Sequence, residues 1–342
     1  MRAIEYSQYG AEPRLVDRPE PACPPDGAVV AVRATGVCRS DWHAWRGHDP
    51  VPLPMVPGHE FAGVVAELGP AVTGFEVGER VTAPFVNGCG HCEWCHGGQA
   101  QVCPDQSQPG FTHAGSFAER VVVRAADFNL VRLPDQIDDV TAASLGCRFA
   151  TSYHALTAQS RLAEGEWLLV VGCGGVGLSA VLVGRALGAR VLAVDPSPAA
   201  RTRALDLGAE SVLASAEPQA VRSVTDGGVH VSLDAVGSGA TASACVRSLR
   251  RRGRHVQVGL MLDRHADAPL PWGPVIAHEL EVVGSHGMAA ADYPALLELI
   301  SSGRLDPRPL VGRVVGLAEA GAELMALDQS VSASAGIVVA TL

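Results

Sequence analysis

A glycine-rich turn between an apolar strand and a helix is the feature that most constrains how this chain can fold. The segment GCGGVG at 172–177 follows the apolar run WLLVV and leads into VGLSAVLVGRALGA, which has the length and apolar pattern of a helix. The next apolar run, RVLAVD, ends at Asp195. This order predicts a strand–turn–helix–strand unit of a parallel sheet, with the phosphates of a dinucleotide at the turn.

The glycines of this turn have separate predicted roles. Gly172 permits the tight turn, Gly174 lets the backbone approach a pyrophosphate, and Gly177 lets the helix pack closely on the strand. The phosphates would then face the amide groups at the start of the helix. A glycine turn without a cofactor is the alternative interpretation, but the flanking strand and helix favour the dinucleotide.

Asp195 indicates which dinucleotide to expect. Its carboxylate is placed to accept hydrogen bonds from an adenosine ribose, and it would repel the additional phosphate of NADP. Arg201 and Arg203 lie close by in the sequence and could favour that phosphate instead. A helix-capping role for Asp195 is the interpretation without a cofactor. We therefore expect NAD, with NADP left open.

The rest of the chain indicates two domains, as its 342 residues allow. The later runs VHVSLDAV, RHVQVGL and LEVVGS supply further strands for a doubly wound parallel sheet over 148–286. Residues 1–147 carry short β-type runs separated by Gly, Pro and Asp clusters. The tail, 287–342, ends in a strand, AGIVVATL, that resembles this first part. We expect the tail to complete a β-rich domain with 1–147.

Composition and charge exclude other classes of protein. A net charge of −10 opposes the neutralisation of phosphates on which nucleic-acid binding relies, and RSLRRRGR at 247–254 is the one short basic run. The first residues, MRAIEYSQYG, lack the pattern of a secretory signal, and glycines interrupt the most apolar stretch, so we expect no membrane span. Nine cysteines without an export signal favour a cytoplasmic protein with reduced thiols and metal ligation.

A loop with four closely spaced cysteines predicts a zinc site. The segment CGHCEWCHGGQAQVC has the spacing C-x2-C-x2-C-x7-C, which lets four thiolates converge tetrahedrally on one ion. Because protein would fill all four positions, the zinc would be structural; an iron–sulfur cluster is the alternative. The neighbouring His91 and His96 are expected to be solvated. The predicted ligands are Cys89, Cys92, Cys95 and Cys103.

Three further segments become informative only together. Cys38, His59 and Cys147 lie in GVCRSDWH, PGHEFAGVV and LGCRFATSYH, and each residue alone is more often a packed or surface group than a ligand. The segment GHEFAGVVAELGPAV at 58–72 fits the signature G-H-E-x2-G-x5-G-x2-V. In this order, with the cysteine loop and the glycine turn, these segments resemble the zinc alcohol dehydrogenases of the medium-chain dehydrogenase/reductase superfamily. The resemblance runs essentially end to end.

The resemblance implies a fold and a reaction. The fold is an α/β arrangement of a GroES-like β-rich catalytic domain and a Rossmann domain with a doubly wound parallel sheet, and the active site lies in the cleft between them. Cys38, His59 and Cys147 would hold a catalytic zinc whose fourth position stays open. Bound zinc lowers the pKa of an alcohol, and the alkoxide then passes a hydride to the nicotinamide of NAD.

The resemblance also assigns roles around the metal. Glu60 is similar to an acidic residue that approaches the metal during ligand exchange, and Asp41 to a carboxylate that orients the liganding histidine. Ser40 and His43 resemble a relay that passes the alcohol proton through the cofactor ribose to solvent. A helix cap for Asp41 and a plain surface position for His43 are the alternatives.

Further cofactor contacts follow from the same resemblance. Arg39 is similar to a pyrophosphate-binding base, and Thr151 to a residue behind the nicotinamide. Many relatives place a second arginine near the C-terminus, where SASAGIVVATL offers only Gly336 and Ile337, so Arg39 would carry that charge alone. The remaining expected contacts are the phosphate-facing amides of Gly175 and Val176, and Val236 and Val258 at the ends of strands.

Aromatic residues suggest an apolar alcohol. Phe85 is similar to a residue that lines the substrate pocket of the family, and Trp42, Trp45 and Phe111 are its expected companions. Packing in the core is the alternative for each. Cys147 favours simple primary or aromatic alcohols, because polyol dehydrogenases of the superfamily commonly carry glutamate at this position.

Three other functions remain as alternatives. They are a polyol or other secondary-alcohol dehydrogenase, a zinc-free quinone or enoyl reductase, and a zinc-containing protein that senses dinucleotides without turnover. The three expected zinc ligands argue against the reductase, and Ser40 with His43 argues against the sensor. By analogy with similar chains we expect a homotetramer, with a dimer as the alternative.

Overall fold

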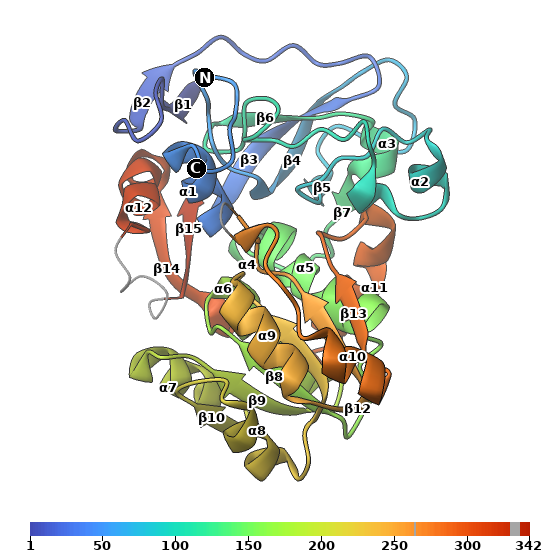
Figure 1. Cartoon of the computed structure of the whole chain (residues 1–342). Helices are drawn as coiled ribbons and strands as arrows, with labels where there is room; N and C mark the ends of the chain where they lie inside the picture. Colours follow the sequence, from blue (N-terminus) through green and yellow to red (C-terminus); the bar gives the residue numbers. More distant parts are fainter. Residues whose placement is uncertain (263–264, 329–335) are drawn as a thin grey trace. The chain divides into compact units, whose positions relative to one another are not determined.

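The computed structural model describes residues 1–262, 265–328 and 336–342. The chain divides into two compact units (Figure 1). The first unit contains Met1–Ala150 and Gly287–Leu342, and the second contains Thr151–His286. Each unit has its own sheet, so the two are described separately.

A seven-stranded, mainly antiparallel sheet forms the first unit. Six of its strands follow the order β14-β15-β3-β4-β5-β7, β6 pairs with β3, and β1 and β2 form a separate pair. The strand β15 at the C-terminus pairs antiparallel with β3, so the end of the chain belongs to this sheet. The strands are β1 (Arg2–Glu5), β2 (Arg14–Asp17), β3 (Ala28–Val37), β4 (Glu60–Leu68), β5 (Arg80–Thr82), β6 (Arg120–Val123), β7 (Val131–Arg132), β14 (Val311–Gly316) and β15 (Ile337–Thr341).

Short helices connect the strands of the first unit. They are α1 (Arg39–Arg46), α2 (Glu93–His96), α3 (Ala126–Asn129), α4 (Asp139–Ala143), α11 (Tyr293–Ser301) and α12 (Ala320–Ala326). Helix α1 follows β3 directly, with Cys38 as its N-cap, and ends at Gly47, whose φ of 77° places it in the left-handed region. The position of Cys38, at the junction of β3 and α1, is therefore set by both elements.

A six-stranded parallel sheet forms the second unit, as the sequence predicted. Its strand order is β10-β9-β8-β11-β12-β13, the doubly wound order in which the chain reverses direction next to β8. The strands are β8 (Trp167–Val171), β9 (Arg190–Val194), β10 (Ser211–Leu213), β11 (Val229–Asp234), β12 (Leu249–Gln257) and β13 (Glu281–Gly284). The helices are α5 (Ala150–His154), which begins at the unit boundary, α6 (Gly175–Ala186), α7 (Pro198–Asp206), α8 (Pro218–Thr225), α9 (Gly239–Arg247) and α10 (Trp272–His278).

The glycine turn lies between β8 and α6, at the carboxyl edge of the parallel sheet. Gly172 has a φ of 92°, which other residues rarely adopt, and its N–H donates to the Val194 carbonyl at 2.8 Å. A Cβ at Gly177 would lie 1.7 Å from the Gly172 carbonyl oxygen. A Cβ at Gly174 would meet no heavy atom within 4 Å. Gly177 is thus required for packing, whereas the space at Gly174 is open.

These two glycines give a matched test of the fold. We expect Gly177→Ala to reduce the free energy of unfolding by about 3 kcal/mol or more, because backbone must move to admit the methyl group. Gly174→Ala should cost at most about 1 kcal/mol, the difference between glycine and alanine at a helix N-cap. Urea denaturation followed by circular dichroism measures both. Equal losses in the two variants would contradict this packing.

Candidate functional site

Three distant residues meet in the first unit. Cys38 stands between β3 and α1, His59 immediately precedes β4, and Cys147 lies in a π-helical turn, Leu145–Phe149. The pairing of Gly36 in β3 with Glu60 in β4 brings the first two together. Their ligand atoms and the Cys147 sulfur all lie within 4.8 Å of one another, and all three residues are buried.

Asp41 braces this group from the first turn of α1. Its Oδ1 accepts hydrogen bonds from His59 Nδ1 and from the Gly58 N–H, each at 2.9 Å, and its Oδ2 accepts from the Cys38 N–H at 3.1 Å. With Nδ1 so engaged, His59 Nε2 is buried and makes no hydrogen bond within the described part of the chain. A buried imidazole nitrogen beside two thiols is a donor set that fits zinc.

Burial and neighbouring charges shift the pKa values of the three residues in different directions. The hydrogen bond from Cys147, supported by the positive charge of Arg148, holds the pKa of Cys38 well below its usual range, although burial alone would raise it. Burial opposes a charge on His59, but the Asp41 carboxylate outweighs it and raises the pKa of His59 well above its usual value. Thiolate is the form of cysteine that binds metal, so the lowered pKa of Cys38 favours its metal-binding form, whereas the hydrogen bond to Cys38 and burial raise the pKa of Cys147.

The four cysteines of the loop converge as a second group. Their sulfur atoms all lie within 4.8 Å of one another, with Cys89 and Cys95 3.9 Å apart and Cys92 and Cys103 3.7 Å apart. The backbone N–H of His91 contributes most to lowering the pKa of Cys89, to about 6. No histidine joins this group among the described residues. Four sulfur donors leave no position for a substrate, so the arrangement fits a structural zinc.

Side chains along α1 lie beside the first group. The Cys38 thiol contacts Ser40 Oγ at 3.9 Å. The guanidinium of Arg39 donates to the Leu327 carbonyl at 2.7 Å and lies 4.9 Å from the centre of the Trp42 ring. His43, one turn further along, has its Nδ1 3.3 Å from a second imidazole, that of His48.

Two of the four predicted aromatic residues border the metal ligands. The rings of Phe85 and Phe111 lie edge-on to His59, with centroids 6.0 Å and 5.3 Å away. Trp45 is 3% exposed within a core cluster and donates to the Ala11 carbonyl. Trp42 packs against that cluster, and its Nε1 donates to Asp328. The structure therefore brings the two phenylalanines to the site, whereas the tryptophans contact other residues.

In the second unit, the predicted dinucleotide contacts gather at the ends of β8, β9, β11 and β12. Asp195 accepts hydrogen bonds from the N–H groups of Cys173 (2.9 Å) and Ser197 (2.8 Å). The amides of Gly175 and Val176 open α6.

The other predicted cofactor-contact residues of this unit differ in their exposure to solvent. Val236 and Val258 follow β11 and β12, and Val236 is 52% exposed, so its side chain does not belong to the core. Thr151 is buried in α5. Arg201 binds the carbonyls of Asp195 and Pro196 at 2.8 Å and 2.9 Å. In the first unit, Ile337 begins β15, and residues 332–335 of the segment SASAGIVVATL lie outside the described residues.

Comparison with known proteins identifies the family of this chain. Residues 24–135 match a family model described as an alcohol dehydrogenase GroES-like domain, and residues 175–302 match a zinc-binding dehydrogenase model. An alcohol dehydrogenase of Geobacillus stearothermophilus is 33% identical over 89% of this chain and 90% of its own length. The chain belongs to the zinc-dependent alcohol dehydrogenase family.

Two further proteins are similar to this chain over nearly its whole length. A sorbitol dehydrogenase of Halalkalibacterium halodurans is 33% identical over 91% of both chains. The solved structure of alcohol dehydrogenase TADH from Thermus sp. ATN1 is 31% identical, with a TM-score of 0.92 over 100% of this chain and 99% of that one. The resemblance and the fold predicted from the sequence, GroES-like and Rossmann, are confirmed.

Within this family framework, the structure adds a residue that sequence reasoning missed. Arg148, next to Cys147, holds Glu60: its backbone N–H and its Nε both donate to Oε1 at 3.1 Å, and its Nη2 contacts Oε2. Both residues are buried, and burial raises the pKa of Glu60 despite the arginine. The available signal was a charged residue inside the apolar segment LGCRFA, which needs a buried partner.

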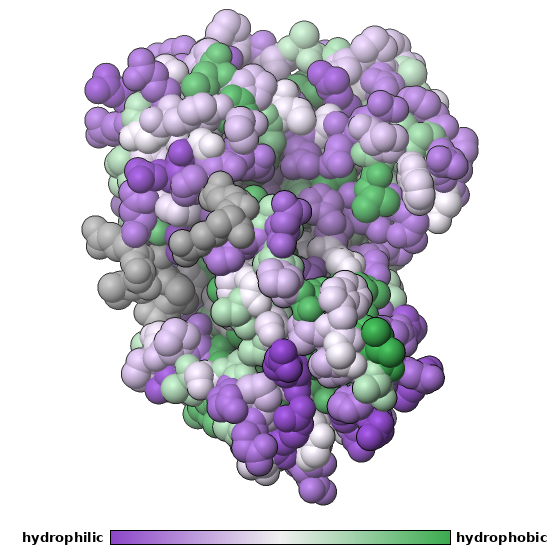
Figure 2. Space-filling model, viewed as in Figure 1, coloured by the Kyte–Doolittle hydropathy of each residue, from purple (hydrophilic) through white to green (hydrophobic). Residues whose placement is uncertain are grey.

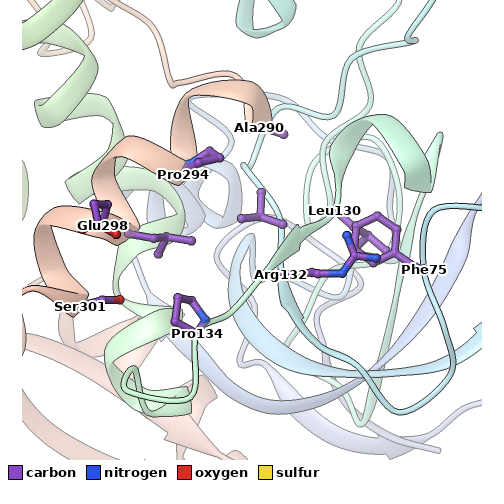
Figure 3. A pocket seen from close by; sticks show the side chains of 10 residues that line it. Phe75, Leu130, Arg132, Pro134, Ala290, Pro294, Glu298 and Ser301 are labelled. Carbon is purple, nitrogen blue, oxygen red and sulfur yellow. The ribbon is translucent and has the colours of Figure 1, made fainter.

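A surface pocket of about 400 Å³ elsewhere in the first unit is separate from the predicted site residues (Figure 3). Most of its lining is apolar, and Arg132, one of its charged residues, already binds Glu79 and lies 4.2 Å from the centre of the Phe75 ring. No described helix combines the length and apolar character that a membrane span requires.

The Arg148–Glu60 pair gives a prediction for stability. Arg148→Met leaves a fully buried carboxylate without its counter-charge, and we expect the free energy of unfolding to fall by about 3–5 kcal/mol. The double variant Glu60→Gln/Arg148→Met removes both charges, so its free energy of unfolding should fall by less than that of Arg148→Met. Urea denaturation at neutral pH measures these changes.

The matched control is the exposed pair of Arg252 and Glu279. Breaking it with Arg252→Met should cost no more than about 1 kcal/mol. A loss from Arg148→Met as small as that of the control would contradict the structural importance of the buried pair.

Proposed function

We propose that this chain is an NAD-dependent zinc alcohol dehydrogenase acting on apolar primary or aromatic alcohols. The observation that carries the proposal is the buried set of Cys38, His59 and Cys147, in which His59 Nε2 has no hydrogen bond within the described residues. When bound, zinc polarises the alcohol oxygen as a Lewis acid, and the nicotinamide ring accepts the hydride. The cysteine loop would hold a second, structural zinc.

The residues of the chain orient the site and move the proton. Asp41 would fix the tautomer of His59, since its carboxylate accepts a hydrogen bond from the Nδ1–H group and leaves the Nε2 lone pair for the metal. Ser40 lies next to Cys38 and would accept the proton of the alcohol hydroxyl. His43, on the same helix, would receive that proton through the cofactor ribose. Glu60 is held by Arg148 in this arrangement, so an approach to the metal would require this ion pair to open.

NAD as the cofactor is supported by Asp195. Its carboxylate lies at the end of β9, next to the glycine turn, where the adenosine ribose binds in sheets of this kind. The nearby cation Arg201 is engaged with two backbone carbonyls. A carboxylate at this position would repel the additional phosphate of NADP. We expect NADH to bind more tightly than NADPH.

Neutralising this charge tests the cofactor assignment. Asp195→Asn keeps the shape of the side chain but removes the repulsion, so we expect the preference for NADH to fall by about tenfold, equivalent to about 1.4 kcal/mol. Fluorescence titration with both reduced cofactors gives the dissociation constants. Asp206→Asn, an exposed carboxylate of α7, is the control and should leave the ratio unchanged. Tighter binding of NADPH to the unmodified protein would overturn the assignment.

The substrate class follows from the rings beside the metal ligands. Phe85 and Phe111 both lie against His59, and Phe85 packs with Cys38 and Cys147. Such a lining favours apolar alcohols over sugars, because polyol hydroxyl groups would lose their water without gaining partners. A polyol substrate remains the second candidate, since a sorbitol dehydrogenase is among the relatives.

A panel of substrates decides between these candidates. Nicotinamide absorbance should show a higher kcat/KM for benzyl alcohol and medium-length primary alcohols than for secondary alcohols or sorbitol. Cys38→Ser should lose this activity because it removes a metal ligand. A preference for sorbitol would favour the polyol dehydrogenase, and absence of turnover with every alcohol would favour a dinucleotide-sensing protein.

We further propose that the chain assembles as a homotetramer in the cytoplasm. On α10, Trp272 and Ile276 are 58% and 76% exposed, and Figure 2 shows hydrophobic residues in green over this helix. The adjacent strand β13 ends the order of the parallel sheet, so one of its edges has no partner strand within the described residues. An exposed apolar helix beside an open sheet edge supports subunit contact there. All nine cysteines are free thiols, in keeping with a reducing compartment.

A further inference from the structure

The end of α1 places a second histidine beside His43. Gly47, with a φ of 77°, reverses the chain, and a Cβ there would lie 3.1 Å from the ring of Tyr9. The His48 N–H then donates to the His43 carbonyl at 2.9 Å. As a result the two imidazoles approach each other, with their Nδ1 atoms 3.3 Å apart and their ring centroids 5.5 Å apart.

Trp42 holds this pair of rings in place. It lies edge-on to both, with centroids 4.8 Å from His43 and 5.2 Å from His48. Its indole N–H donates to Asp328 at 2.7 Å, and Arg39 lies over the ring. Asp328 and Arg39 therefore hold the Trp42 ring, and this ring in turn supports the orientation of both imidazoles.

The two histidines differ in their exposure to solvent. His43 is half-buried, and His48 is exposed. A hydrogen bond between two Nδ1 atoms requires that one carries a proton and the other a lone pair, which is also the arrangement for proton transfer. The surrounding charges are mixed: Asp49 is adjacent, and Asp328 lies 3.7 Å from Arg46, while Arg39 lies on Trp42. Burial raises the pKa of Asp49.

We propose that His48 receives the substrate proton from His43 and delivers it to solvent. This inference rests on the proposed function, in which oxidation of an alcohol releases one proton. His43 takes up that proton at the ring nitrogen that does not face His48. Its Nδ1–H bond breaks as an Nδ1–H bond forms on His48, and His48 loses its other ring proton to water or buffer. Exchange with solvent at the rings restores the starting tautomers.

Stopped-flow measurement with a pH indicator in weak buffer tests the transfer. We expect His48→Gln to slow proton release by roughly tenfold, because the amide cannot take up a proton. His43→Gln should be at least as slow, and the double variant no slower than His43→Gln, since both residues act on one path. Added imidazole should restore the rate in His48→Gln, where it can reach His43, and His278→Gln is the control.

A second measurement uses the protein without cofactor. In the unmodified protein, nuclear Overhauser spectra should show contact between the ring protons of His43 and His48, because the ring centroids lie 5.5 Å apart. In His48→Gln this contact should be lost. Absence of the contact in the unmodified protein would show that the two rings are not neighbours in solution, and would overturn the proposal.

The outcomes separate this proposal from the proposed function. If the unmodified protein reduces no NAD with any alcohol, the proposed function fails and the transfer fails with it. If the protein reduces NAD normally, but His48→Gln releases protons as fast as the unmodified protein and added imidazole does not change that rate, only the role of His48 is overturned.

Discussion

The candidate metal centre depends on the three hydrogen bonds that the buried carboxylate of Asp41 accepts. Two come from the backbone N–H groups of Cys38 and Gly58, and the third comes from the ring of His59. They join the end of β3 to the start of β4 and set the orientation of the imidazole at the same time. Because Asp41 belongs to α1, the same bonds also fix the helix that carries Ser40 and His43.

Neither carboxylate near the centre is available as a metal ligand in this arrangement. Asp41 is occupied by its three hydrogen bonds, and Glu60 is occupied by Arg148. The ligand atoms of Cys38, His59 and Cys147 are buried and lie within 4.8 Å of one another, and His59 Nε2 has no hydrogen bond within the described residues. A buried polar atom without a partner is unfavourable. A divalent cation such as zinc would bind all three ligand atoms at once, which supports the metal proposed at this position.

The sequence predicted those parts of the molecule that local spacing determines. The glycine turn and the cysteine loop are each set within about 15 residues, so their residue types and intervals are sufficient. The set of Cys38, His59 and Cys147 came only from resemblance, because the register of β3 against β4 brings the first two together and Cys147 reaches them from a distant turn. Arg148 pairs with a residue 88 positions away, and its partner could not be read from spacing.

The aromatic residues show the same limit. Phe85 and Phe111 reach His59, whereas Trp45, of similar character, is in a core cluster and Trp42 contacts Asp328 and two histidines. Tertiary packing decides between these positions, and the sequence pattern around each tryptophan does not differ in a way that reveals it. His48 had a local signal, the glycine that ends α1, but its contact with His43 depends on the backbone conformation of that turn.

Substitution of cobalt for zinc tests most directly whether three distant residues share one metal ion. Cobalt(II) bound to thiolate gives charge-transfer and visible bands whose intensity reports tetrahedral sulfur coordination. The two groups of ligands predict two cobalt ions per chain, one of which is lost, with its spectrum, in Cys38→Ser or Cys147→Ser. If the chain binds cobalt only at the cysteine loop, and neither substitution changes the spectrum, the account of the catalytic centre is contradicted.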